Sequence, residues 1–186
     1  MGIEMNDIEL VKRLQNPETK NQAFRLLVNT YKERIYWHVR RMVSIHEDAD
    51  DIVQNVFIKI FKGIENFKSN SKLYTWIYRI ATNESISFIE KNKKHITQSI
   101  ENRDDDVSHD APDAEIIMKK LMLALQKLPA KQRAVFNMRY FEDMPYKKMS
   151  EIMETSEGAL KASYHHAMNK IKEFILETEK DKQWTI

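Results

Sequence analysis

The chain has 186 residues, of which 42% are hydrophobic and 31% charged, with a formal net charge of +2 and no cysteine. This composition excludes an intrinsically disordered chain, a disulfide scaffold and a thiolate metal site. No stretch approaches the roughly 18 apolar residues that span a bilayer, and the first residues lack the apolar core of a signal peptide. We therefore expect a cytoplasmic protein without membrane insertion.

The scarcity of turn-forming residues predicts an all-α protein. The chain contains 3 glycines and 4 prolines, while good helix formers fill long periodic runs. The first helical stretch runs from Asp7 to about Lys94, with breaks near 16–17, 44–47 and 67–72. These breaks predict about four helices.

Residues 48–64 predict an amphipathic helix. Its broad apolar face, which we assign to the core, consists of Ile52, Val53, Val56, Phe57, Ile60, Phe61 and Ile64. Asp48, Asp50 and Asp51 fall in the expected first turn, where their charge opposes the positive end of the helix dipole. The exposed strip is Asp51, Gln54, Asn55 and Lys59, which either docks against another protein or is an ordinary solvated face. A metal site for diphosphate chemistry is disfavoured, because no second acidic cluster with matching spacing is present.

Aromatic residues alternate with cations in the next segment. Between Lys59 and Lys94, eight basic residues outnumber three acidic ones. The predicted buried stripe consists of Leu73, Ile77, Ile80, Ala81 and Phe88, and Trp76, Arg79 and Asn83 share a neighbouring face. Tyr74 and Trp76 are either core residues or platforms for bases of single-stranded DNA, where each stacked base contributes roughly 1–3 kcal/mol.

An acidic segment separates the two helical halves. The apolar rhythm stops between about Thr97 and Pro112, and residues 101–115 carry seven acids against one arginine. Such a run cannot bury enough apolar surface to become ordered by itself. We expect a flexible linker that joins two small helical domains.

The C-terminal half predicts two helices followed by a helix-turn-helix. The first helix has an apolar face of Ile116, Ile117, Leu121, Leu125 and Leu128 and stops before Pro129, and the second runs from about Lys131 to Phe141. In residues 145–175, Met149, Ile152 and Met153 mark a short helix, Thr155 or Ser156 caps a longer one, and Gly158 allows close backbone approach near the turn.

The longer helix of this motif has two opposite faces. Its apolar stripe consists of Leu160, Tyr164, Ala167, Ile171 and Phe174, and its polar stripe of Lys161, His165, Asn169 and Lys172. A helix of this kind fits the major groove of DNA, although any surface helix of a bundle has a polar face.

No pattern of catalytic or ligand-binding residues accompanies these helices. The chain lacks a glycine-rich phosphate loop and a nucleophile elbow. His165 and His166 are neighbours on a helix and point about 100° apart, so they do not converge on one metal ion. We expect no catalytic activity, metal, cofactor or small-molecule substrate.

The order of these segments resembles the extracytoplasmic-function (ECF) group of bacterial RNA polymerase sigma factors, in the sigma-70 family. The resemblance covers nearly the whole chain and rests on the motifs DADDIVQNVFIKIFKGI, NFKSNSKLYTWIYRIATN, LPAKQRAVFNMRYFEDMPYKKMSEIM and SEGALKASYHHAMNKI. It implies a region 2-like domain at 1–96 that binds core polymerase and melts the −10 element. A flexible acidic linker at 97–113 and a region 4-like helix-turn-helix domain at 114–186, which recognises the −35 element, would follow.

The resemblance also implies a role for each candidate residue. The residues expected to bind core polymerase are Asp51, Gln54, Asn55 and Lys59. Those expected at the −10 element are Phe67, Lys68, Asn70, Lys72, Tyr74, Trp76, Arg79 and Asn83. Those expected at the −35 element are Lys161, Ala162, His165, His166 and Asn169. The implied partners are core RNA polymerase and promoter DNA, together with an anti-sigma protein of the kind that inhibits many members.

The chain departs from the family pattern in two places. Family members often carry several arginines in the recognition helix, which this chain lacks there, and the loop that usually begins Phe-Arg-Gly reads Phe67-Lys68-Ser69. The leading hypothesis is a sigma factor that directs polymerase to promoters and melts them. The alternatives are a stand-alone helix-turn-helix regulator of transcription and a helical adaptor that binds only proteins.

Overall fold

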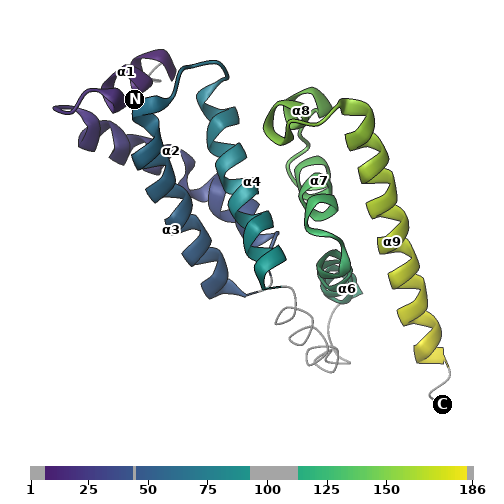
Figure 1. Cartoon of the computed structure of the whole chain (residues 1–186). Helices are drawn as coiled ribbons and strands as arrows, with labels where there is room; N and C mark the ends of the chain where they lie inside the picture. Colours follow the sequence, from purple (N-terminus) through teal and green to yellow (C-terminus); the bar gives the residue numbers. More distant parts are fainter. Residues whose placement is uncertain (1–6, 44, 93–112, 184–186) are drawn as a thin grey trace. The chain divides into compact units, whose positions relative to one another are not determined.

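The computed structural model describes residues 7–43, 45–92 and 113–183, which contain helices, turns and no β-strand (Figure 1). The chain divides into two compact units, one formed mainly by the helices before Ser85 and the other mainly by the helices after residue 112. The prediction of an all-α protein is confirmed. None of the helices in the described part of the chain combines the length and apolar character needed to cross a bilayer.

The first helices follow the predicted breaks. They are α1 (Asp7–Gln15), α2 (Lys20–Arg40), α3 (His46–Gly63), the short 3-10 helix η1 (Ile64–Asn66) and α4 (Leu73–Lys91). Pro17 lies in the turn between α1 and α2, where the Asn16 carbonyl accepts hydrogen bonds from the backbone N–H groups of Thr19 and Lys20. The chain then leaves helical geometry again at residues 67–72.

The facing sides of α2 and α3 form the core of the first unit (Figure 1). Leu27 and Ile35 of α2 are fully buried, as is Ile77 of α4. The predicted apolar face of α3 is only partly buried: Ile52, Val56, Ile60 and Ile64 lie in the core, whereas Val53, Phe57 and Phe61 are half-buried at its edge. On α4, likewise, Leu73, Ile77 and Ala81 are buried, while Ile80 and Phe88 are half-buried.

A buried hydrogen bond joins α2 to α4. His38 is fully buried, and its Nε2 lies 3.0 Å from Oγ1 of Thr82. The Thr82 hydroxyl donates its proton to the carbonyl of Tyr78 at 2.8 Å, so His38 Nε2–H is the donor in the first contact. Each of these two buried polar groups has a hydrogen-bond partner, which offsets the cost of removing it from water.

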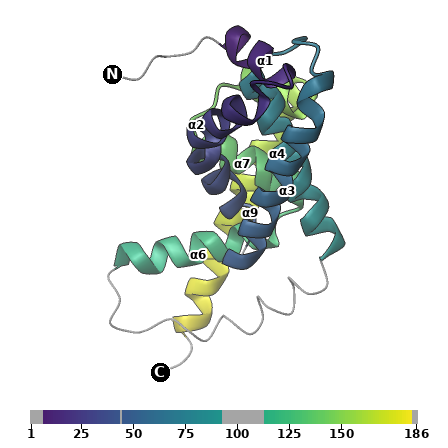
Figure 2. The same cartoon turned by 90° about the vertical axis from the view of Figure 1, so that its left-hand side faces the viewer.

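Among the described residues after 112, the helices are α6 (Asp113–Lys127), α7 (Ala130–Tyr140), α8 (Tyr146–Met153) and α9 (Glu157–Gln183). α6 and α7 both pack against α9, and α6 crosses it (Figure 2). The predicted acidic linker falls outside the described residues, except that Asp113 already begins α6.

The apolar stripe predicted for the long helix is confirmed. Leu160, Ala167 and Ile171 of α9 are buried, and Tyr164 and Phe174 are half-buried. The ring of Phe136 of α7 lies at the centre of this core and stacks on Tyr164, with ring centroids 5.7 Å apart. Burial also raises the pKa of Tyr164. The apolar face predicted for α6 is too wide, because Ile117 is 61% exposed.

The turn between α8 and α9 is made without glycine. Glu154 adopts a left-handed conformation with φ 51°, and Ser156 caps α9 by accepting a hydrogen bond from the backbone N–H of Ala159 at 3.3 Å. Capping by Ser156 is therefore confirmed. The expectation for Gly158 is wrong, because a Cβ atom at this position would have no neighbour within 4 Å. Gly158 lies inside α9 and makes no close backbone approach.

Arg133 of α7 caps the C-terminal end of α6. The side chain is only 2% exposed, and Nη2 donates to the carbonyls of Gln126 at 2.5 Å and Leu128 at 3.3 Å. The last carbonyls of a helix have no partner inside the helix, so a cation placed there satisfies them and interacts favourably with the helix dipole. Burial lowers the pKa of Arg133 to about 10, which leaves the guanidinium charged at neutral pH.

We predict that Arg133→Ala lowers the free energy of unfolding by about 2–3 kcal/mol, because the carbonyls at the end of α6 lose their buried donor. Urea unfolding followed by circular dichroism measures the change. Lys131→Ala, an exposed position on the same helix, is the control and should change stability by less than about 0.5 kcal/mol. Equal effects of the two substitutions would contradict the capping role.

Gly158→Ala is expected to stabilise the protein by about 0.5–1 kcal/mol, because alanine fits the helix and the added methyl group meets no atom. Gly63→Ala in α3 is the matched comparison. There the new Cβ would lie 3.3 Å from Cζ2 of Trp76, so the steric contact should offset the gain in helix propensity. Thermal unfolding of both variants tests this, and equal stabilisation would show that Trp76 yields freely.

Candidate functional site

The four residues predicted to bind another protein share one exposed face of α3. Asp51, Gln54, Asn55 and Lys59 are all exposed. Lys59 Nζ lies 2.5 Å from Oε1 of Glu84 on α4, so this cation links the two helices. An exposed ion pair of this kind contributes no more than about 1 kcal/mol, and a partner can replace it at little cost.

An apolar groove lies beside this strip, between α2 and α3. It has a volume of about 390 Å³ and is lined by Phe24, Val28, Gln54, Phe57, Ile58, Phe61 and Lys62. Phe24 of α2 packs edge-on against both α3 rings, with centroids 6.5 Å from Phe57 and 4.9 Å from Phe61. Sequence reasoning placed both α3 rings in the core and missed the groove. The available signal was the width of the apolar face on α3, which exceeds what one neighbouring helix covers.

The acidic residues before this groove lie differently from the prediction. Because α3 begins at His46, Glu47 and Asp48 occupy the first turn and Asp50 and Asp51 lie one turn later. Asp50 faces His46, with Oδ2 3.7 Å from Nε2. Burial, followed by the charges of Asp51 and Glu47, raises the pKa of Asp48. The geometry places Glu47 and Asp48 where their charge opposes the positive end of the helix dipole, without a side-chain cap hydrogen bond at the N-cap residue Ile45.

The loop before α4 is anchored from α1. Nε2 of Gln15 donates to the carbonyls of Ile64 at 3.1 Å and Phe67 at 2.9 Å. The Phe67 side chain is buried, so it does not offer an exposed ring for stacking as a predicted DNA-contact residue would. Of the other predicted loop residues, Lys68, Asn70 and Lys72 are exposed. The loop therefore exposes two cations and an amide, and the hydrogen bonds from Gln15 hold the backbone at its start.

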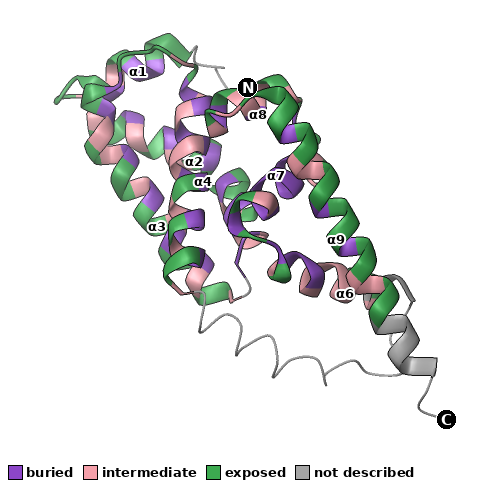
Figure 3. Cartoon of the chain, turned by 45° about the vertical axis from the view of Figure 1, so that its right-hand side comes forward, coloured by how far each residue is buried: buried purple, intermediate pink, exposed green. Residues whose placement is uncertain are grey.

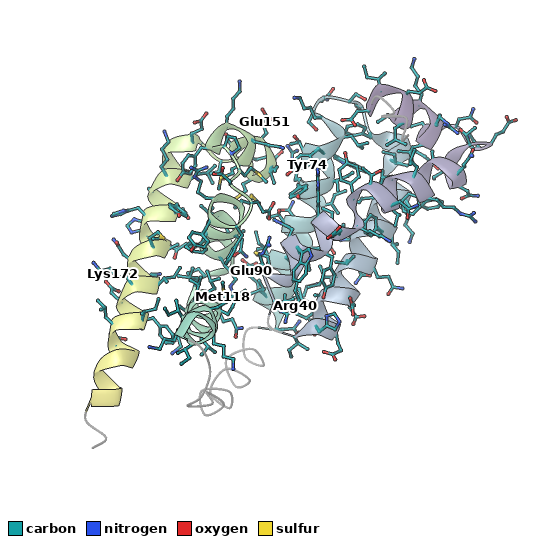
Figure 4. All side chains as sticks on the ribbon, turned by 180° about the vertical axis from the view of Figure 1, so that it is seen from behind. Arg40, Tyr74, Glu90, Met118, Glu151 and Lys172 are labelled. Carbon is teal, nitrogen blue, oxygen red and sulfur yellow. The ribbon has the colours of Figure 1, made fainter. Side chains whose placement is uncertain are left out.

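Two aromatic residues of α4 are packed rather than free. The Trp76 ring lies 5.0 Å from the Phe67 ring and against Gly63, and Tyr74 stacks on Tyr78 with centroids 4.2 Å apart. Both side chains remain half-buried, so each keeps an accessible edge. Figure 4 shows Tyr74 near the start of α4. The close approach of Trp76 is possible because residue 63 has no side chain.

The predicted single-strand surface continues along α4 beyond these rings. Asn83 is exposed, and Arg79, one turn before it, is half-buried. Together with the loop, this surface combines cations, amides and the edges of aromatic rings.

Tyr31 lies on the neighbouring helix α2. Burial and the charge of Asp7 raise its pKa to about 12, so this phenol stays neutral at physiological pH.

The recognition face predicted on α9 is exposed throughout. Lys161, Ala162, His165, His166 and Asn169 are all exposed, and Lys172 lies on the same outer side of the helix (Figures 3 and 4). Lys161 Nζ lies 5.6 Å from the Tyr146 ring centroid, and His165 Nε2 lies 3.2 Å from Asn169 Nδ2. This face can donate hydrogen bonds to phosphates and base edges. In the described residues no group of three or more His, Cys, Asp or Glu side chains forms a metal site.

Comparison with known proteins identifies the family. The model of Sigma-70 region 2 matches residues 27–95, and the model of Sigma-70 region 4 matches residues 118–171. The second match contains α8 and α9 as far as Ile171, and the first contains the α3 strip, the loop and all of α4. The chain belongs to the sigma-70 family of RNA polymerase sigma factors.

Relatives place the chain within one group of that family. It is 30% identical to the ECF RNA polymerase sigma-E factor of Haemophilus influenzae, over 94% of this chain and 98% of that protein. It is 28% identical to the ECF sigma factor SigW of Bacillus subtilis, over 89% and 96% respectively. The protein is an ECF sigma factor, a transcription initiation factor that binds core RNA polymerase and promoter DNA.

Solved structures agree with this fold. The chain superposes on CnrH, solved in complex with the cytosolic domain of CnrY, with a TM-score of 0.65 and 18% identity over 91% of this chain and 96% of that one. It superposes on the sigma factor RpoE of Bartonella quintana, solved with the anti-sigma factor NepR, with a TM-score of 0.61 and 21% identity over 82% and 96%.

The departure of the loop from Phe-Arg-Gly has a measurable cost. Ser69 adopts φ 54°, a conformation that glycine adopts without strain. We predict that Ser69→Gly raises the free energy of unfolding by about 0.5–1 kcal/mol. Ser71→Gly, at a position outside the left-handed region, should instead destabilise the protein slightly. Chemical unfolding of both variants measures this, and destabilisation by Ser69→Gly would contradict it.

Proposed function

We propose that the sigma-factor function is divided among three surfaces of this chain. The α3 strip with its groove binds core polymerase, the loop at 67–72 with the start of α4 binds the −10 element as a single strand, and the outer face of α9 reads the −35 element. The observation that supports this most strongly is that the predicted polar residues of α3 and of α9 each lie on one exposed face of a packed helix, and that the loop before α4 exposes Lys68, Asn70 and Lys72.

The proposed polymerase surface combines polar and apolar contacts. Gln54 belongs both to the polar strip and to the lining of the groove, and Ile58, on the groove wall, is 43% exposed. An exposed apolar side chain in a groove with a polar rim is typical of an interface, because its burial supplies binding energy while the rim gives specificity. Asp51, Asn55 and Lys59 would then orient the partner.

The proposed −10 surface suits an unpaired strand. Lys68 and Lys72 attract phosphate, and the accessible edges of Tyr74 and Trp76 provide apolar contact for an extruded base. Asn83 carries an amide that can pair with a base edge. Arg79 lies between the aromatic residues and Asn83 on α4 and is assigned to the same strand.

The remaining assignments follow from this division. We assign the two domains to 1–96 and 114–186, joined by the acidic segment 97–113, whose charge suits a channel that otherwise holds RNA. We expect the protein to act in the cytoplasm, without catalytic activity of its own and under an anti-sigma protein. The complex of the sigma factor RpoE with the anti-sigma factor NepR is the precedent for that last expectation.

The polymerase surface can be tested at Ile58. Ile58→Asp places a charge on the exposed groove wall and should weaken binding to purified bacterial core polymerase about tenfold or more, because the carboxylate would be desolvated in the complex. Fluorescence anisotropy with labelled protein measures the affinity. Leu176→Asp on α9, another exposed apolar position, is the matched control and should retain affinity. Unchanged binding by Ile58→Asp would remove the groove from the interface.

The two DNA surfaces are separated by reconstituted transcription. Asn83→Ala should slow open-complex formation severalfold while core affinity stays unchanged, and Lys161→Ala should reduce transcription only from promoters that carry a −35 element. Trp76 is a poor probe because its substitution also removes packing against Phe67. Run-off transcription and permanganate footprinting provide the readouts. Promoter-specific DNA binding without core polymerase would instead support a stand-alone regulator.

A further inference from the structure

The recognition helix carries a side-chain pair that constrains a histidine. His165 and Asn169 are one turn apart on the exposed face of α9, with Nε2 of the imidazole 3.2 Å from Nδ2 of the amide. Nδ2 bears hydrogens and no lone pair for accepting, so Nε2 is the acceptor in this contact. A neutral imidazole that accepts at Nε2 holds its proton at Nδ1. The pair therefore selects one of the two tautomers of His165.

The tautomer of His165 matters for recognition because the exposed face of α9 has few other side chains that donate a hydrogen bond in a fixed direction. The sequence of α9 contains no arginine, so the bidentate reading of guanine by a guanidinium is not available on this helix. Lys161 provides a mobile charge rather than a directed pair of donors. His166 does not compete for the same position, since its ring lies 6.3 Å from that of His165 at an angle of 60°. An imidazole with a fixed tautomer is a directed single donor.

We propose that Asn169 is a positioning residue that holds His165 in the Nδ1–H tautomer, and that His165 donates this proton to a purine edge of the promoter. Guanine is the expected base, because it presents the N7 and O6 acceptors side by side in the major groove. This inference rests on the proposed function of α9 in reading the −35 element and names the residue pair that confers specificity there.

The first test uses the full chain without DNA. Imidazole 15N spectra, recorded near pH 9 and therefore well above the ordinary imidazole pKa of about 6.5, report the tautomer, and loss of a signal in His165→Gln assigns His165. We expect a protonated Nδ1 in the native chain and a shift toward protonated Nε2 in Asn169→Ala. Asn169→Asp, whose carboxylate only accepts, should give protonated Nε2. A native chain with protonated Nε2, or a spectrum unaffected by Asn169→Ala, would overturn the inference.

The second test measures base preference with core polymerase and a library of promoters randomised at the −35 element. The native chain should favour guanine at one position, and His165→Ala, Asn169→Ala and Asn169→Asp should each reduce that preference about five- to tenfold. Glu177→Gln, an exposed position two turns after Asn169 and outside the set of residues assigned to the −35 element, is the control and should keep it. An unchanged preference in His165→Ala would overturn the reading role of this residue. A native chain that ignores the −35 element would contradict the proposed function of α9 itself, while the tautomer measurement would still stand.

Discussion

The protein depends on helices that bury one side and leave the other side free. In α9, Leu160, Ala167 and Ile171 are covered, while Lys161, His165 and Asn169 are exposed. Stacking of Tyr164 on Phe136 fixes the rotation of α9 about its own axis, because any other rotation would expose these apolar groups. The rotation of the helix in turn decides which polar groups are exposed on the face that we propose for DNA.

The same constraint holds in the first unit. Gly63 lets the Trp76 ring lie against α3, and the buried pair of His38 and Thr82 joins α4 to α2. α4 is therefore held by contacts at two positions along its length, and its remaining face is presented with the loop that precedes it. Because this part of the protein is already ordered, it loses little conformational entropy of its own when it binds a ligand.

The sequence predicted those features that depend on periodicity and failed where a tertiary neighbour decides. The stripe of α9, the Ser156 cap and the helix breaks were predicted from spacing and from residue chemistry. Phe57 and Phe61 were assigned to the core because spacing shows the direction of a side chain but not whether a neighbouring helix covers it. Phe67 was assigned to the DNA surface from the family pattern, and it is buried. The capping role of Arg133 could not be predicted from the sequence, because it depends on how α7 packs against the C-terminal end of α6.

The anchoring of the loop by Gln15 has a consequence for the limits of the first unit. The region 2 match begins at residue 27, yet the amide that holds the carbonyls of Ile64 and Phe67 belongs to α1, well before that point. A shortened chain that starts at the family boundary would keep α3 and α4 and lose this restraint. The family model therefore covers less than the compact unit, which also includes α1.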